Sequence, residues 1–341
     1  MARQAHLIGS VSLPTAEMVM TTAADFLDDC CTRIPDGETG ERGYWIRWQK
    51  TTFESCSDLE LEMVTETVPG FQDTVERPFF KIKEGTDLDA IDLGELGYAD
   101  AAIASYAISK KLQGQGIIGQ NVRFQVSIPS PMALIVGFIT PGSQLGVEPA
   151  IIAAMKRDLA KLQAAIPSED LAVQFDVCYE VVALDAGTPL PYHDKIGGSV
   201  TRVAEMCDYV SDAVELGIHL CYGDPGHKHI VEPKDLATSV SFANGISKST
   251  KREINFMHMP VPVNRKDEDY FIPLRNLKMD SITRLILGLV HHSDGLEGSK
   301  ARVAVAETII KEFDIATECG FGRRALETIP ELLQIHRDLC D

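Results

Sequence analysis

Short apolar runs alternate with longer amphipathic stretches along almost the whole chain, and this alternation constrains the fold more than any other feature. Eight of the runs have the length of β-strands. They are His6–Gly9, Thr32–Pro35, Phe124–Ile128, Ala172–Val177, Gly217–Cys221, Ile254–Met259, Ile286–His291 and Asp314–Glu318. Helices are predicted between them, among others over Ala16–Cys31, Pro149–Ala165, Ser199–Leu216, Pro233–Ser247, Ser299–Phe313 and Arg324–Leu339. Strand–helix repeats of this kind predict an α/β fold, and eight of them predict a (β/α)8 TIM barrel.

Two segments are longer than a strand–helix unit requires, at about residues 41–120 and 260–280. Neither is rich in Gly, Ser or Pro, so neither has the composition of a flexible linker. Barrels of this type commonly use about 250 residues or more as one domain. We therefore expect residues 1–341 to form a single (β/α)8 barrel domain, with both segments inserted over its C-terminal face.

The chain carries 50 Asp and Glu residues against 32 Lys and Arg, which gives a formal net charge of −18. A surface with this charge repels nucleic acid and anionic membranes, so neither is expected as a partner. No run of about 18 apolar residues predicts a membrane span. The first residues lack the apolar core of a secretory signal peptide. The eight cysteines are scattered and are expected to be reduced thiols in a cytoplasmic protein. The sequence does not indicate an oligomeric state.

Polar, titratable or sulfur-containing residues stand at the carboxyl end of each predicted strand. In chain order they are Ser10, Asp36 and Glu38, Ser127, Asp176, His219 and Cys221, His258, His291 and His292, and Cys319. The carboxyl ends of the strands in a (β/α)8 barrel lie at one face of the molecule, where such barrels carry their active sites. The sequence therefore predicts a functional site at this face.

His219-Leu220-Cys221 is the first sign of what that site does. In a strand, residues i and i+2 point to the same face, so His219 and Cys221 can bind one ion. Cys319 ends a later strand and is able to face them across the barrel. Thiolate and imidazole ligands favour zinc, and three protein ligands with an open position are typical of catalytic zinc. The alternative is simple packing, because free cysteines are commonly buried in protein cores.

Five segments, in order along the chain, resemble a known family. They are Ile8-Gly9-Ser10, Asp36-Gly37-Glu38 with Glu41-Arg42, Gln174-Phe175-Asp176, His219-Leu220-Cys221-Tyr222 and Cys319-Gly320-Phe321-Gly322-Arg323-Arg324. Together they resemble the catalytic, C-terminal barrel of cobalamin-independent methionine synthase and related short zinc-dependent alkyltransferase-like proteins. These belong to the uroporphyrinogen decarboxylase/methionine synthase-like superfamily. The uroporphyrinogen decarboxylase fold alone is a weaker rival, because it does not require the His219, Cys221 and Cys319 set.

The resemblance implies a zinc ion held by His219, Cys221 and Cys319, which binds a homocysteine-like thiol as a thiolate for transfer of a methyl or other alkyl group. It also implies that Ser10, Glu38 and Asp176 hold the amino acid part of this substrate. Asp36 is a further candidate for substrate contact, although it could equally cap a turn. The family has a histidine near the reacting group, and His292 falls at its position, as a tentative catalytic residue.

The sequence also departs from the family pattern. The family has a glutamate on the sixth strand as the fourth zinc ligand, whereas this chain has His258 there, a tentative fourth ligand. The N-terminal half of the full-length synthase has no counterpart. The residues from Ser127 to Pro131 replace a Gly-Pro-containing strand end. A folate or corrinoid methyl donor is therefore possible, but the sequence does not support one.

Three functions remain open from the sequence. The first is a zinc-dependent methyl- or alkyltransferase acting on a small thiol or amino acid substrate. The second is a zinc-dependent lyase or hydrolase that cleaves a C–S or C–O bond, and the third is a non-catalytic small-molecule binder. Residues outside the motifs were weighed as well: His227 and His229 could contact substrate or simply lie in a solvated loop. Trp45 and Trp48 could form a lid, although packing is the more common role.

Overall fold

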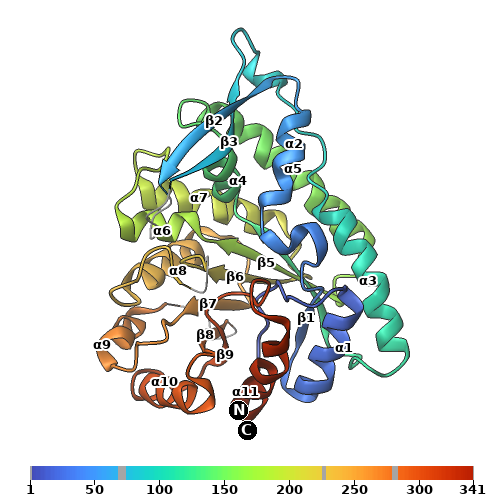
Figure 1. Ribbon diagram of the computed structural model, residues 1–341, viewed down its shortest axis with the longest axis vertical. Helices are drawn as coiled ribbons and strands as arrows, with labels where there is room; N and C mark the ends of the chain where they lie inside the picture. Colours follow the sequence, from blue (N-terminus) through green and yellow to red (C-terminus); the bar gives the residue numbers. More distant parts are fainter. Residues whose placement is uncertain (1, 68–73, 225–227, 279–282, 341) are drawn as a thin grey trace.

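Seven parallel strands form one curled sheet in the computed structural model, which describes residues 2–67, 74–224, 228–278 and 283–340 (Figure 1). The order across the sheet is β1-β4-β5-β6-β7-β8-β9. The strands are β1 (Arg33–Pro35), β4 (Arg123–Pro129), β5 (Leu171–Val177), β6 (Glu215–Leu220), β7 (Phe256–Pro260), β8 (Arg284–Val290) and β9 (Asp314–Thr317). The sequence predicted a strand at each of these seven places, which confirms the α/β fold and its parallel sheet.

The predicted first strand, His6–Gly9, does not form a regular strand of the sheet. The chain from Ala5 to Val11 makes only isolated parallel bridges. Ala5 pairs with Cys31 on one side and with Ile315 on the other, and further bridges start at Ser10 and Val11. Its carbonyl groups have other partners. The Gln125 side-chain amide donates to the oxygens of Leu7 (2.9 Å) and Ile8 (3.1 Å), and Gln174 also donates to Ile8. The result is a curled, TIM-like half-barrel in place of a continuous ladder of eight strands.

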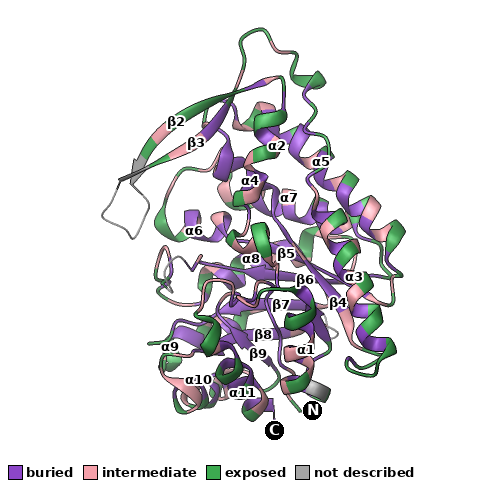
Figure 2. Cartoon of the chain, turned by 45° about the vertical axis from the view of Figure 1, so that its right-hand side comes forward, coloured by how far each residue is buried: buried purple, intermediate pink, exposed green. Residues whose placement is uncertain are grey.

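Helices cover the outside of the sheet, and the first and last of them pack together where the chain termini meet (Figure 1). The longer helices are α1 (Ala16–Leu27), α3 (Tyr98–Gly114), α5 (Gln144–Ala165), α7 (Lys195–Tyr209), α8 (Ala237–Ser249), α10 (Gly295–Ile309) and α11 (Ile329–Cys340). The shorter ones are α2 (Lys50–Ser55), α4 (Pro131–Phe138), α6 (Tyr179–Ala186) and α9 (Glu268–Phe271). The central strands are buried along their length, as Figure 2 shows, because helices or the barrel interior cover both faces.

The long segment between β1 and β4 contains an antiparallel hairpin, β2 (Leu59–Thr67) and β3 (Thr74–Ile82), which stands apart from the main sheet (Figure 1). Stacked rings join it to the helices: Phe53 of α2 packs on Phe80 of β3 and on Phe138 of α4, with centroids 5.7 and 4.9 Å apart. α3 then leads back to β4. The smaller segment at 260–280 holds α9 and a 3₁₀ turn (Ile272–Asn276), and its last two residues lie outside the described ranges.

No helix in the described part of the chain is both long enough and apolar enough to cross a membrane.

Arg302 of α10 is fully buried and joins this helix to the end of the sheet. Its guanidinium donates to both carboxylate oxygens of Asp294 (2.8 Å each) and to the carbonyl oxygens of Leu289 (2.8 Å) and Val263 (2.7 Å). Burial alone would raise the pKa of Asp294, but hydrogen bonds from Arg302 and Lys266 lower it from 3.8 to about 2. The resulting stabilisation is present at neutral pH and is lost as the pH falls from about 4 toward 2.

We expect Arg302→Met to lower the free energy of unfolding at pH 7 by about 3 kcal/mol, because it leaves two carbonyl groups without a donor and removes one of the two cations that bind the half-buried Asp294 carboxylate. Urea denaturation followed by circular dichroism measures the change. Lys300→Met on the same helix is the control, since Lys300 is exposed and should change stability by less than about 0.5 kcal/mol. An equal effect of the two substitutions would contradict this account.

Candidate metal and substrate site

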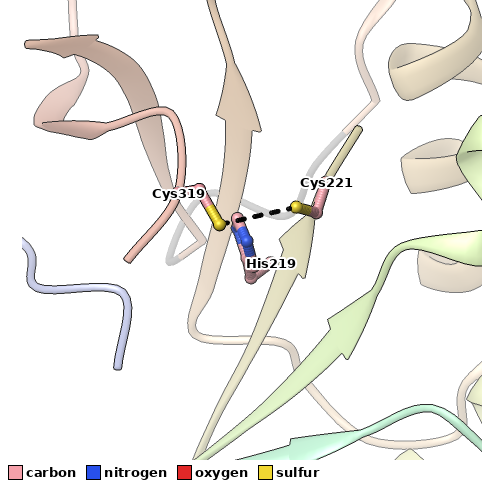
Figure 3. A group of neighbouring side chains, drawn as sticks. All are labelled: His219, Cys221 and Cys319. Atoms are coloured by element: carbon pink, nitrogen blue, oxygen red, sulfur yellow. Dashed lines mark hydrogen bonds between the residues drawn. The ribbon is translucent and has the colours of Figure 1, made fainter. Parts of the chain in front are cut away.

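His219, Cys221 and Cys319 come together at the carboxyl ends of β6 and β9. His219 lies in β6, Cys221 directly follows that strand, and Cys319 lies two residues beyond β9. One ligand atom from each residue lies within 4.8 Å of the others, and the two sulfur atoms are 3.8 Å apart. Figure 3 shows the three side chains pointing toward one another from two parts of the chain. The i, i+2 spacing on β6 and the curl of the sheet together produce this arrangement.

The surroundings of the two thiols fit a cation. The pKa of Cys221 is raised well above its usual value by contact with Cys178 and by burial, and that of Cys319 by contact with Cys221 and by burial. Polar groups nevertheless point at both sulfurs: Gly223 N–H donates to Cys221 Sγ (3.2 Å), and Arg323 lies 3.7 Å from Cys319 Sγ. A bound cation would stabilise both thiolates, and this donor set suits zinc.

His258 lies beside this group but outside it. Its Nδ1 is 2.7 Å from Nδ1 of His219, and its Nε2 is 3.0 Å from the carbonyl oxygen of Thr317. Burial lowers the pKa of both imidazoles, that of His258 to about 4, so both rings are neutral at pH 7. Both ring nitrogens of His258 therefore already have hydrogen-bond partners within the protein.

A cavity of about 520 Å³ opens onto the three candidate ligands. Ser10, Glu38 and Asp176, the residues expected to hold an amino acid, all line it. Gln174 donates to the carboxylate of Asp176 (2.9 Å). Burial raises the pKa of Glu38 and of Asp176 well above ordinary carboxyl values, and for Glu38 the nearby charge of Asp176 adds to the effect. Two carboxyl groups with raised pKa values, one buried and one partly buried, form a site that would be stabilised by a cationic group such as an ammonium.

Asp36 does not line this cavity. Its carboxylate accepts hydrogen bonds from Arg42 (2.6 Å), the Ser105 hydroxyl (2.7 Å) and the backbone N–H of Glu38 (2.9 Å). These contacts fix the turn that carries Glu38, whose φ of 49° is in the left-handed region. The structure thus brings Glu38 to the cavity and places Asp36 behind it, as the cap of a turn.

The remaining predicted histidines also lie elsewhere. His292 does not line the cavity, and its Nε2 is 3.0 Å from Glu331 of α11. His291 contacts the carbonyl oxygen of Val261 (2.7 Å). His229 is buried 2.8 Å from Glu318, whereas His227 lies outside the described residues.

Trp45, Cys178 and Tyr179 also line the cavity, although none of them belongs to the five sequence motifs; of the three, only Trp45 was weighed from the sequence, as a possible lid. Trp45 and Tyr179 form an aromatic wall with ring centroids 5.8 Å apart. Trp45 has a φ of 58°, and its side chain partly offsets the rise that burial produces in the pKa of Asp176. A bulky residue with positive φ is strained, and such strain concentrates at functional sites. Among the described residues, Glu38 and Trp45 are the non-glycine residues with positive φ, and both line this cavity.

The fold and these side chains define a class: a TIM-like α/β protein with a cluster of potential soft-metal ligands beside two carboxyl groups at the carboxyl ends of its strands. Over its full length the chain resembles solved structures of B12-independent methionine synthases. The protein from Shewanella sp. W3-18-1, solved in complex with selenomethionine, is 11% identical with a TM-score of 0.65, and the alignment covers 99% of this chain and 97% of that one.

A Listeria monocytogenes protein assigned as a vitamin B12-independent methionine synthase is 14% identical with a TM-score of 0.57, and the alignment covers 100% of this chain and 98% of that one. No protein-family profile matches the sequence, and no curated protein matches it. At these identities the structural likeness establishes the fold.

We expect the protein, purified without a histidine tag, to bind about one zinc ion per chain, because an imidazole and two thiols, all at least partly buried, meet at one point. Elemental mass spectrometry measures the metal content. The Cys221→Ser/Cys319→Ser double variant should contain almost none, and Cys207→Ser, at a buried cysteine within α7, should bind as much as the wild type. A folded wild-type protein that takes up no zinc when zinc is supplied would contradict the metal site.

Proposed function

We propose that this protein is a zinc-dependent alkyltransferase that transfers a methyl or other alkyl group to a small thiol of the homocysteine kind. The observation that carries the proposal is that one cavity holds both the candidate metal ligands and the Glu38 and Asp176 carboxyl groups. A homocysteine-like molecule has a thiol at one end and an ammonium at the other. The cavity offers a complementary group for each.

His219, Cys221 and Cys319 would hold the zinc ion. Bound zinc lowers the pKa of a coordinating thiol, so that its sulfur is a nucleophile at neutral pH. Glu38 and Asp176 would bind the ammonium group, with Ser10 beside them, and this contact would fix the position of the thiol. In the transfer, a sulfur–carbon bond forms, the bond from that carbon to the donor breaks, and the thiol proton is released.

We propose that residues 1–341 act as one barrel domain, whose segment at 41–120 forms a wall over the carboxyl ends of the strands. Tyr44, Trp45, Ile46, Arg47 and Arg77, all from this segment, line the cavity. Together with Tyr179 they line the cavity with aromatic and apolar groups and two guanidinium groups, so an alkyl donor with an apolar body would suit the aromatic part.

Incubation of the zinc-loaded protein with L-homocysteine and a panel of methyl donors, including 5-methyltetrahydrofolate and methylcobalamin, tests the function. Mass spectrometry should detect an alkylated thiol. Cys319→Ala should abolish this product while its circular dichroism spectrum stays that of the wild type. Cleavage of a C–S or C–O bond without an alkylated thiol would replace the proposal with a lyase or hydrolase. Tight binding without turnover would replace it with a binding protein.

We expect Trp45→Phe to weaken L-homocysteine binding roughly tenfold, because it removes the indole N–H that favours the charged form of the Asp176 carboxyl group. Isothermal titration calorimetry with zinc-loaded protein measures the affinity. Trp48→Phe is the matched control, since Trp48 packs against Tyr98 and does not line the cavity. Equal affinity of the Trp45→Phe variant and the wild type would show that this indole plays no part in binding the amino acid.

A further inference from the structure

The contact between the His219 and His258 rings is a hydrogen bond with one donor nitrogen and one acceptor nitrogen. The two residues are partners in the parallel pairing of β6 and β7, both are buried, and their Nδ1 atoms are 2.7 Å apart. At this distance one nitrogen must carry the hydrogen and the other must accept it, because two protonated or two unprotonated nitrogens would repel each other.

The second contact of His258 decides which nitrogen donates. Its Nε2 lies 3.0 Å from the backbone carbonyl oxygen of Thr317, and a carbonyl oxygen can only accept. His258 Nε2 therefore carries the hydrogen, and Nδ1 of the neutral ring carries the lone pair. It follows that His219 donates from its own Nδ1, and that Nε2 of His219 has its lone pair free.

Gly288 makes this arrangement possible. It lies in β8, between the strand of His258 and the strand of Thr317. A Cβ atom at this position would lie 3.0 Å from Nε2 of His258 and 2.8 Å from the Cα atom of Glu318. Without a side chain on Gly288, the His258 ring can reach across β8 to the Thr317 carbonyl group.

We infer that His258 is a positioning residue, which holds His219 in the tautomer that binds a metal through Nε2, and that it is not itself a ligand. The chain of contacts runs from the Thr317 carbonyl through His258 to His219. Metal-bound histidines generally donate their second ring N–H to a fixed acceptor, which sets the ring orientation and strengthens the metal bond. Here a second imidazole provides that acceptor. The inference rests on the metal site of the proposed function.

Three variants separate positioning from other roles. His258→Leu fills much of the same volume and removes both hydrogen bonds. His258→Gln keeps an oxygen that can accept and an N–H that can donate. His336→Leu is the matched control, because it removes another buried imidazole that bonds within α11 (2.7 Å to the Leu332 carbonyl oxygen).

The first experiment uses metal-free protein labelled with ¹⁵N-histidine. Long-range ¹H–¹⁵N correlation spectra at pH 7.5, assigned with a His219→Gln variant, report which nitrogen of each ring carries the hydrogen. We expect His219 to be protonated at Nδ1 and His258 at Nε2. The Nε2-protonated form of His219 in the wild type would overturn the inference, whether or not the protein binds zinc.

The second experiment measures zinc affinity by competition with a chromophoric chelator. His258→Leu should bind zinc roughly 10- to 100-fold more weakly than the wild type. His258→Gln should recover most of this loss, and His336→Leu should match the wild type. Unchanged affinity in His258→Leu would overturn the inference. So would an equal loss in the Gln and Leu variants, which would make His258 a ligand. A wild-type protein that binds no zinc would refute the proposed function, while the spectra still decide the tautomers.

Discussion

Cys221 and Cys319 are 98 residues apart in the sequence, yet their sulfur atoms lie 3.8 Å from each other. The curl of the parallel sheet produces this contact, since it turns the carboxyl ends of β6 and β9 toward a common point. The candidate substrate residues depend on the same curl. Asp176 lies near the carboxyl end of β5, Glu38 follows β1, and Ser10 lies in the segment that runs between β1 and β9. A flatter sheet of the same strands would leave these groups on separate surfaces.

The candidate site combines several features that are energetically unfavourable in the absence of a ligand. Glu38 and Trp45 have positive φ, two carboxyl groups have raised pKa values, and a buried thiol lies in contact with a partly buried one. Each of these features opposes folding when no ligand is present. A metal ion on the sulfurs and an ammonium on the carboxyl groups would relieve most of them at once. Their concentration in one cavity is the physical reason to regard it as a binding site.

The local sequence pattern predicted the position of a side chain correctly where that position depends only on its own strand. The period of two on β6 placed His219 and Cys221 on one face, and the apolar runs located all seven strands of the sheet. It was a poor guide where the role depends on a neighbour. Asp36 and Glu38 are two residues apart, but contacts with Arg42 and Ser105 hold one carboxylate behind the cavity while the other faces it. His292 follows β8 as expected, and its ring turns to Glu331.

The sequence by itself determined the order of the seven strands of the main sheet and the candidate metal ligands, because periodicity and residue chemistry are local properties. Only the tertiary structure decided how the first strand-like segment, His6–Gly9, is bound. Side-chain amides of Gln125 and Gln174 take the carbonyl groups that a regular ladder would use. It also decided that His258 contacts His219 and that Trp45 joins the cavity. These contacts link residues far apart in the chain, and hydrogen-bond direction and backbone strain leave no pattern in a single sequence.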